Sequence, residues 1–167
     1  HTALRRQRQM CIRDSSEGSL LSIYKDLEVK EYANLIKDKR FNFQTSTFSN
    51  ILNLFSKNSM NGVLFDLGVS SLQLDKPERG FSFMHEGELD MRFDNTFGVS
   101  AKDWINKASE KELADVFYYY GEERKSRQYA KKIIEARKQK KINSTKNLAE
   151  LFKLKGFHKR HPATNIF

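Results

Sequence analysis

The sequence predicts an α/β fold: a parallel sheet with flanking helices, followed by a region that is entirely helical. Two observations predict it. Between residues 19 and 66, short apolar segments of strand length alternate with segments of helical periodicity, joined by short links. From about residue 101 onward every apolar pattern has the helical period. Alternating strands and helices with short links are typical of a parallel, doubly wound sheet.

Three strands and two helices are expected in the first part. Residues 20–24 and 41–45 have strand length, and the second of these alternates apolar and polar side chains. Residues 63–66 begin with a continuous apolar run, which is typical of a strand buried on both faces. Helices are expected over residues 27–36 and 49–55, where apolar residues recur at helical spacing.

The third expected strand ends at Asp66 and turns on Gly68. A buried parallel strand that ends in a carboxylate delivers it to the carboxyl edge of the sheet, where ligands bind. Asp66 is therefore the first candidate functional residue, as a hydrogen-bond acceptor for a ligand. The alternative is a carboxylate that caps the following turn. Gly68 either leaves room for a close approach or adopts a positive φ.

After residue 75 the pattern changes. Residues 76–100 are rich in glycine and acidic residues and have little periodicity, which predicts a long ordered loop. Capping patterns at Ser100 and Ser109 then begin two helices, and Gly121 fits a helix C-terminus. The second of these helices is expected to bury one stripe of side chains: Leu113, Val116, Phe117 and Tyr120.

Two further helices are expected beyond this point. One covers residues 125–141 and carries basic side chains around an apolar face, and the next begins at Ser144. The net charge of +9 lies entirely in this half of the chain. Residues 1–100 hold 13 Lys and Arg and 13 Asp and Glu, whereas residues 101–161 hold 17 and 8. This asymmetry indicates either a surface that faces nucleic acid or a solvated set of basic helices, and charge alone does not separate them.

The composition argues against a disulfide-stabilised protein, a metal-binding protein and a membrane-spanning protein. Cys11 is the only cysteine, so no internal disulfide forms and a reducing compartment is expected. The four histidines show no metal-ligand spacing, and no apolar run approaches the ~20 residues of a membrane span. Residues 1–15 show no apolar periodicity and cluster arginines. We expect them to be a non-native or disordered leader, with a basic nucleic-acid arm as the alternative.

Several long motifs occur in one order along the chain. DLGVSSLQLDKPERGFSFMHEGELDMRFD occupies residues 66–94, YGEER residues 120–124, and HPAT residues 161–164. In this order the motifs resemble the bacterial small-subunit ribosomal RNA cytosine-N4 methyltransferases. The resemblance covers about residues 19–167 and implies a partial Rossmann-like, class I S-adenosylmethionine methyltransferase sheet with an inserted all-helical domain.

The resemblance also implies a domain organisation, a cofactor and a partner. S-adenosylmethionine is the expected cofactor and ribosomal RNA of the small subunit the expected partner, in the cytoplasm, without a metal or a membrane. The expected parts are a cofactor-binding domain (16–75), an ordered acidic loop at the active site (76–100), an inserted helical RNA-substrate domain (101–160) and the start of the return to the sheet (161–167).

Four residues fall on or near the family's cofactor positions: Phe48, Asp66, Gln73 and Asp26. Asp66 is also a possible acceptor for the amine that is methylated. Six further residues are expected on the RNA side: Arg79, Asp90, Arg92, Asp94, Arg124 and Lys125. The alternatives for these six are a salt-bridged structural loop and a solvated helix face.

The chain departs from the family in two places. No glycine-rich turn precedes residue 19, and Tyr24 stands where an acidic residue usually holds the ribose hydroxyls, with Asp26 two residues on. We therefore expect an internal fragment that binds the cofactor weakly or not at all. The alternative function is a non-catalytic, basic RNA-binding or ribosome-assembly module on an α/β remnant.

Overall fold

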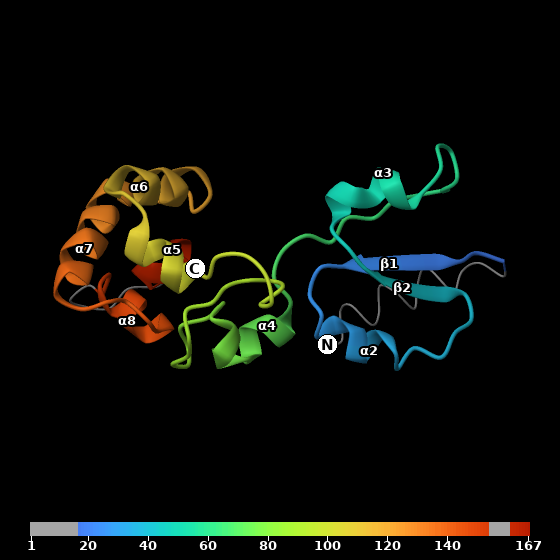
Figure 1. Cartoon of the computed structure of the whole chain (residues 1–167), viewed down its shortest axis with the longest axis horizontal. Coiled ribbons are helices and arrows are strands. Elements are labelled where there is room, and N and C mark those ends of the chain that lie inside the picture. The colour runs from blue at the N-terminus through green and yellow to red at the C-terminus, as the bar shows by residue number, and fades with distance from the viewer. Residues whose placement is uncertain (1–16, 154–160) are drawn as a thin grey trace. The chain divides into compact units, whose positions relative to one another are not determined.

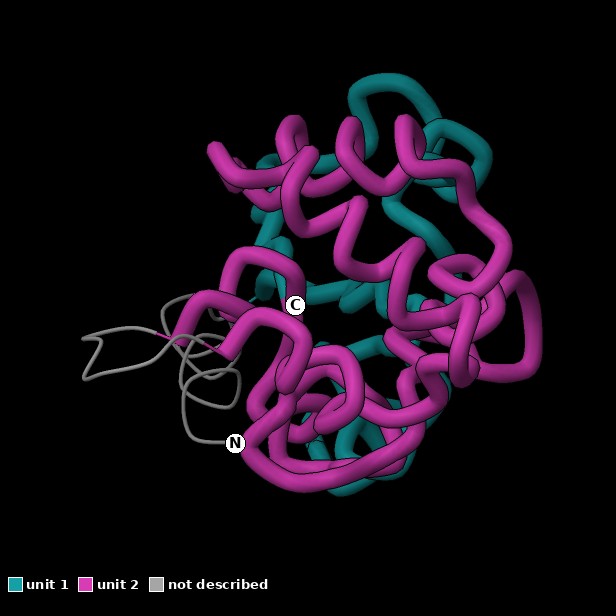
Figure 2. Tube along the Cα trace, turned by 90° about the vertical axis from the view of Figure 1, so that its left-hand side faces the viewer, with its two compact units in different colours: residues 1–68 teal, residues 69–167 magenta. Residues whose placement is uncertain are grey.

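The computed structural model describes residues 17–153 and 161–167, and the chain divides into two compact units after Gly68 (Figure 2). Each unit is described by itself. The leader expected at residues 1–15 lies outside the described residues. Within the described residues, no helix is long and apolar enough to cross a membrane.

The first unit contains a two-stranded parallel sheet. β1 spans Leu20–Tyr24 and β2 spans Phe41–Thr45, in a register that pairs Leu20 with Phe41 and Tyr24 with Thr45. Both strands have the predicted bounds. The helix between them, α2 (Val29–Ala33), is shorter than the predicted 27–36 and buries Val29 and Ala33. Figure 1 shows β1 and β2 between α2 and α3.

A short helical segment follows β2, as η1 (Phe48–Asn50) and α3 (Ile51–Leu54). The strand predicted at residues 63–66 is wrong, because this segment forms no strand and its side chains are exposed. A β-strand is stable only when a neighbouring strand pairs with its backbone. In the described residues β1 and β2 pair with each other, and residues 63–66 pair with neither of them. The described sheet is thus small and parallel.

The second unit is mostly helical. Two short elements, α4 (Ser71–Asp75) and η2 (Pro77–Arg79), precede a loop over residues 80–100. The helices that follow are α5 (Ala101–Lys107), α6 (Glu110–Tyr119), α7 (Ser126–Gln139), α8 (Thr145–Glu150) and η3 (Pro162–Asn165). That these helices are an insertion into a sheet domain stays a prediction.

One hydrophobic core joins these helices to the loop. Leu89 of the loop is fully buried together with Leu113 of α6, Ile133 of α7 and Phe152 beyond α8. The rings of Tyr129 and Phe152 pack with centroids 4.5 Å apart. Because Leu89 belongs to this core, the loop is held on the helices from inside.

The predicted helix starts are confirmed. The Ser100 side chain accepts a hydrogen bond from the Asp103 amide, and Ser109 forms a complete capping box with Glu112. Tyr120 was expected in the buried stripe of α6 but is 85% exposed, so that prediction is wrong. Tyr120 is the residue that follows α6, and its ring lies beyond the core that buries Leu113 and Phe117.

Gly121 lies at the C-terminus of α6, as predicted. Its φ is not positive, so a close approach explains the glycine. A Cβ at this position would lie 2.2 Å from the carbonyl oxygen of Asn165. The end of η3 therefore packs directly against the end of α6.

Candidate functional site

In the first unit, the candidate site lies at the carboxyl edge of the parallel sheet. β1 ends at Tyr24 and β2 at Thr45, which are paired, and the Ser46 amide donates to the Tyr24 carbonyl oxygen at 3.0 Å. Because the two strands are parallel, the residues that follow them lie at one edge. Asp26 and Phe48 are those residues, so the structure places two of the predicted cofactor residues at the edge where α/β proteins bind ligands.

Asp26 supplies the carboxylate at this edge. Its side chain is only 5% exposed, and Oδ1 accepts a hydrogen bond from the Glu28 amide at 3.0 Å. The Tyr24 ring instead stacks on Phe43 of β2, with centroids 5.7 Å apart and planes 22° apart. Tyr24 is therefore part of the packing on the sheet, and the acidic group nearest the end of β1 is Asp26.

An aromatic pair brings the Asp66 segment to Phe48. The Phe48 and Phe65 rings meet edge to face with centroids 6.2 Å apart, and both side chains are more than half exposed. Asp66 follows Phe65 and is exposed, which corrects the expectation of a buried carboxylate at a strand end. Gly68 has a φ of 118° with open space around it, so the positive φ is the reason for glycine there.

Gln73 belongs to the second unit and lies in the first turn of α4. It is 3% exposed, its Oε1 accepts from the Ser70 amide at 2.9 Å, and Ser70 Oγ accepts from the Gln73 amide at 3.4 Å. This capping box fixes the Gln73 side chain against its own helix. Gln73 and Asp66 belong to different units, so the position of each residue is described only within its own unit.

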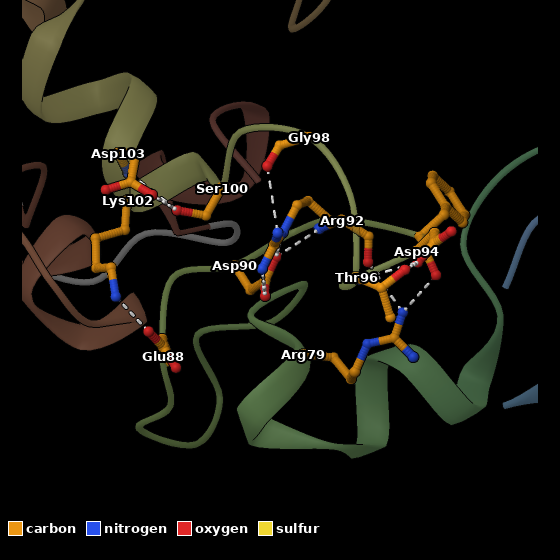
Figure 3. A network of polar contacts seen from close by, with 11 residues as sticks. Arg79, Glu88, Asp90, Arg92, Asp94, Thr96, Gly98, Ser100, Lys102 and Asp103 are labelled. Carbon is orange, nitrogen blue, oxygen red and sulfur yellow. Dashed lines mark hydrogen bonds and ion pairs between the residues drawn. The ribbon is translucent and has the colours of Figure 1, made fainter. Parts of the chain in front are cut away.

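Arg79 is a buried cation of the second unit (Figure 3). It is 3% exposed, and its Nη2 donates to the carbonyl oxygens of Arg92 and Phe93 at 2.9 and 3.0 Å. Its guanidinium lies over the Phe81 ring, 5.9 Å from the centroid. Arg79 therefore ties η2 to the far side of the loop through charge-assisted hydrogen bonds.

Asp90 and Arg92 form a bidentate ion pair in the same loop. Arg92 Nε and Nη2 donate to the two Asp90 oxygens at 2.6 and 2.8 Å, and the Arg92 amide donates to Oδ1 at 3.1 Å. These hydrogen bonds hold the pKa of Asp90 below its usual range. Arg92 Nη1 also donates to the carbonyl oxygen of Gly98 at 3.3 Å. These contacts give both side chains a structural part in the loop.

Asp94 has a local partner. Its Oδ1 accepts from the Thr96 amide at 2.9 Å and from Thr96 Oγ1 at 2.5 Å, which closes a small turn (Figure 3). Arg124 and Lys125 lie elsewhere, in the turn between α6 and α7, where both are exposed. The structure thus gathers Arg79, Asp90 and Arg92 into one network, and a contact of any of them with RNA stays a prediction.

Sequence reasoning missed the residue that fastens the loop to α8. Thr145 is fully buried, its Oγ1 donates to the His85 carbonyl oxygen at 3.1 Å and accepts from the Gly87 amide at 3.1 Å. Its own amide donates to the Gly87 carbonyl oxygen at 3.0 Å. The contact spans 58 residues of sequence, so no local pattern points to it.

The edge in the first unit has the chemistry that a nucleoside cofactor needs. An exposed aromatic ring can stack on a base, and a carboxylate can accept hydrogen bonds from ribose hydroxyls. Phe48 and Asp26 are therefore the residues that would hold such a cofactor. Among the described residues, no group of three or more His, Cys, Asp and Glu could hold a metal ion.

Comparison with known proteins gives one consistent result. A profile of the MraW methylase family matches residues 8–167. Similar curated proteins are named ribosomal RNA small subunit methyltransferase H. The Hamiltonella defensa protein is 45% identical over 160 residues, which cover 91% of this chain and 51% of that protein.

Two further relatives with the same name show similar identity and coverage. The protein of Legionella pneumophila strain Corby is 46% identical over 162 residues, covering 92% of this chain and 53% of the relative. That of Rickettsia bellii strain RML369-C is 47% identical over 143 residues, covering 84% and 46%. The chain spans about half the length of the curated relatives it matches.

Proposed function

The chain belongs to the MraW methylase family, and from this premise we propose that its protein methylates the N4 amine of a cytidine in small-subunit ribosomal RNA. S-adenosylmethionine is the proposed methyl donor. The family match over residues 8–167 carries the proposal, and the names of the relatives support an RNA substrate. An enzyme of this kind would work in the cytoplasm, where ribosomal subunits are.

The reaction sets what the protein must provide. The bound cofactor supplies a methyl group made electrophilic by a sulfonium. The cytidine N4 would take this methyl group and would release one proton to water. The N4 lone pair is delocalised into the ring, so in-line positioning and a hydrogen-bond acceptor for the amine contribute more than a strong base.

We assign these tasks to residues of both units. In the first unit, Phe48 stacks on the adenine and Asp26 accepts from the ribose hydroxyls. Asp66, which follows the ring that contacts Phe48, accepts from the target amine or from the cofactor. In the second unit, Gln73 in the first turn of α4 is the proposed cofactor-binding residue. The proposal for Asp26 is supported by its position at the end of β1 and by the ring stacking that occupies Tyr24.

The second unit is proposed to hold the RNA. The loop with Asp90, Arg92 and Asp94 borders the target base, with Arg79 holding it in shape. Arg124 and Lys125 contact phosphates, since the chain's positive charge is concentrated in these helices. The target base has to leave its stack to reach the amine acceptor.

A second candidate is a non-catalytic RNA-binding or assembly module. The segment around Asp66 favours this candidate, because its side chains are exposed and it forms no strand. The two candidates differ in whether this chain's edge residues bind the cofactor.

A chimera tests this difference. Residues 17–167 replace the matching half of the Legionella pneumophila relative, and calorimetry measures S-adenosylmethionine binding. We expect binding that is lost in Phe48→Ala and Asp26→Asn and kept in Asp38→Asn, an aspartate paired with Arg40 in the same unit. Cofactor affinity unchanged by Phe48→Ala and Asp26→Asn would contradict the assignment. A chimera that binds RNA but no cofactor would favour the second candidate.

A further inference from the structure

Thr145, at the start of α8, is a polar side chain in the interior of the second unit. It is fully buried, and its hydroxyl donates to the His85 carbonyl oxygen and accepts from the Gly87 amide, both at 3.1 Å. A buried hydroxyl costs free energy unless its hydrogen bonds are made, and an apolar side chain of the same shape would fill the space as well. The hydroxyl therefore does more than fill the core, because it fixes two backbone groups of the loop over residues 80–100.

Gly87 is packed between η2 and α8. A Cβ at Gly87 would lie 1.8 Å from the Pro77 carbonyl oxygen, so the backbone of Gly87 lies directly against η2. From the other side, the Thr145 amide donates to the Gly87 carbonyl oxygen at 3.0 Å. The position of Gly87 is thus set by both elements, and it determines where the chain enters the segment that carries Asp90.

Contacts with the helices continue along this segment up to Asp90. The Leu89 amide donates to the carbonyl oxygen of Asn143, just before α8, at 3.2 Å. The amide of Ala101, the first residue of α5, donates to the Asp90 carbonyl oxygen at 2.7 Å. Backbone hydrogen bonds therefore connect the start of α8, through the buried Leu89, to the residue that carries the carboxylate.

Met91, between Asp90 and Arg92, has a strained backbone. Its φ is 61°, in the left-handed region that side chains other than Asn and Asp rarely adopt. Its amide donates to the Arg79 carbonyl oxygen at 3.0 Å, and its two neighbours form the bidentate ion pair (Figure 3). A strained residue persists only where the surrounding contacts hold it, and such residues cluster at functional sites. The strain at Met91 indicates that the geometry of this turn serves a function.

We propose that Thr145 is a positioning residue for methyl transfer. By fixing residues 85–87 on α8, it holds the turn at Met91, and with it the ion pair of Asp90 and Arg92, in the geometry that receives the target base. In-line transfer depends on the placement of the base, and a misplacement of about 1 Å costs up to ~100-fold in rate. The inference rests on the proposed function for the reaction that it serves, whereas the hold of Thr145 on the ion pair does not depend on that function.

The full chain tests this hold through the pKa of Asp90, which carboxyl NMR measures in the folded protein. The charges of Arg92, Arg79 and Lys102 act on this carboxylate, and the side-chain hydrogen bonds of Arg92 lower its pKa most. We expect Thr145→Val to raise the Asp90 pKa toward its usual value, because a loosened turn weakens these hydrogen bonds. Thr145→Ser keeps the hydroxyl and the lowered pKa. An Asp90 pKa that is the same in the valine and serine variants would overturn the proposal.

Gly121→Ala is the matched control for lost stability. Its Cβ would meet the Asn165 carbonyl oxygen at the end of α6, so this variant destabilises the same unit away from the loop. In the folded Gly121→Ala variant the Asp90 pKa is expected to stay as low as in the unmodified chain. A rise as large as that in Thr145→Val would mean that lost stability alone moves the pKa, and the proposal would fail.

Methyl transfer by the chimera supplies the functional readout, on unmodified small ribosomal subunits. Thr145→Val is expected to lower kcat by about tenfold or more while the KM for S-adenosylmethionine is unchanged, whereas Thr145→Ser and Gly121→Ala keep kcat within about twofold. Equal kcat values for the valine and serine variants would contradict the positioning role and leave the proposed function intact. An unmodified chimera without methyl transfer defeats the proposed function instead, and the Asp90 pKa then still decides whether Thr145 holds the ion pair.

Discussion

Thr145 offers the sharpest test of how the loop over residues 80–100 is held. Thr145→Val keeps the volume and removes the hydroxyl, which donates to the His85 carbonyl oxygen and accepts from the Gly87 amide. The stranded Gly87 donor costs about 1–3 kcal/mol. His85 is exposed, so its carbonyl oxygen can bond water instead, and the loss of this hydrogen bond costs less than the stranded Gly87 donor. The extra buried methyl group returns about 0.8 kcal/mol, which leaves a net loss of about 2 kcal/mol.

Thr145→Ser is the matched variant, because it keeps the hydroxyl and loses only a methyl group, at about 1 kcal/mol. Urea unfolding monitored by circular dichroism gives both free energies, and hydrogen exchange reports the Gly87 amide. We expect the valine variant to be less stable than the serine variant and to lose protection at Gly87, whereas Thr45→Val, at an exposed site, stays within about 0.5 kcal/mol. A valine variant as stable as the serine variant would show that the Thr145 hydroxyl does not hold the loop.

Two other perturbations test contacts elsewhere in the second unit. Gly121→Ala should destabilise the second unit by about 1–3 kcal/mol, because its Cβ would meet the Asn165 carbonyl oxygen, whereas Gly62→Ala, with open space, should be near neutral in urea unfolding. The Asp90 pKa is lowered in the folded state by Arg92, so the pair stabilises the fold above pH ~4 and stops doing so as pH falls through the folded pKa. The stability difference between the unmodified chain and Arg92→Gln should thus be constant above pH ~5 and shrink below pH ~4, and a difference that grows on acidification would contradict this.

Local patterns predicted the elements whose causes are local. The strands at residues 20–24 and 41–45 have the expected bounds, and the capping serines Ser100 and Ser109 begin helices as expected. Each of these depends on residues within a few positions in the sequence. The family motifs then pointed to the family itself.

Features that depend on distant partners were not predictable in this way. The apolar run at residues 63–66 reads as a buried strand, but a strand forms only when its backbone pairs with a neighbour, and in the described sheet β1 and β2 pair only with each other. Tyr120 fits the helical stripe by spacing, although α6 ends one residue earlier. Thr145 reads as an ordinary helix start, and its bonds to the loop appear only when segments 58 residues apart meet.

We propose that this chain's residues support methyl transfer to cytidine N4. The most direct measurement uses the chimera with the Legionella pneumophila relative on unmodified small ribosomal subunits, followed by nucleoside mass spectrometry. We expect N4-methylcytidine, reduced at least tenfold by Asp66→Asn and unchanged by Asp38→Asn. Methylation of another position, or N4-methylcytidine formed equally by the Asp66→Asn chimera, would contradict it.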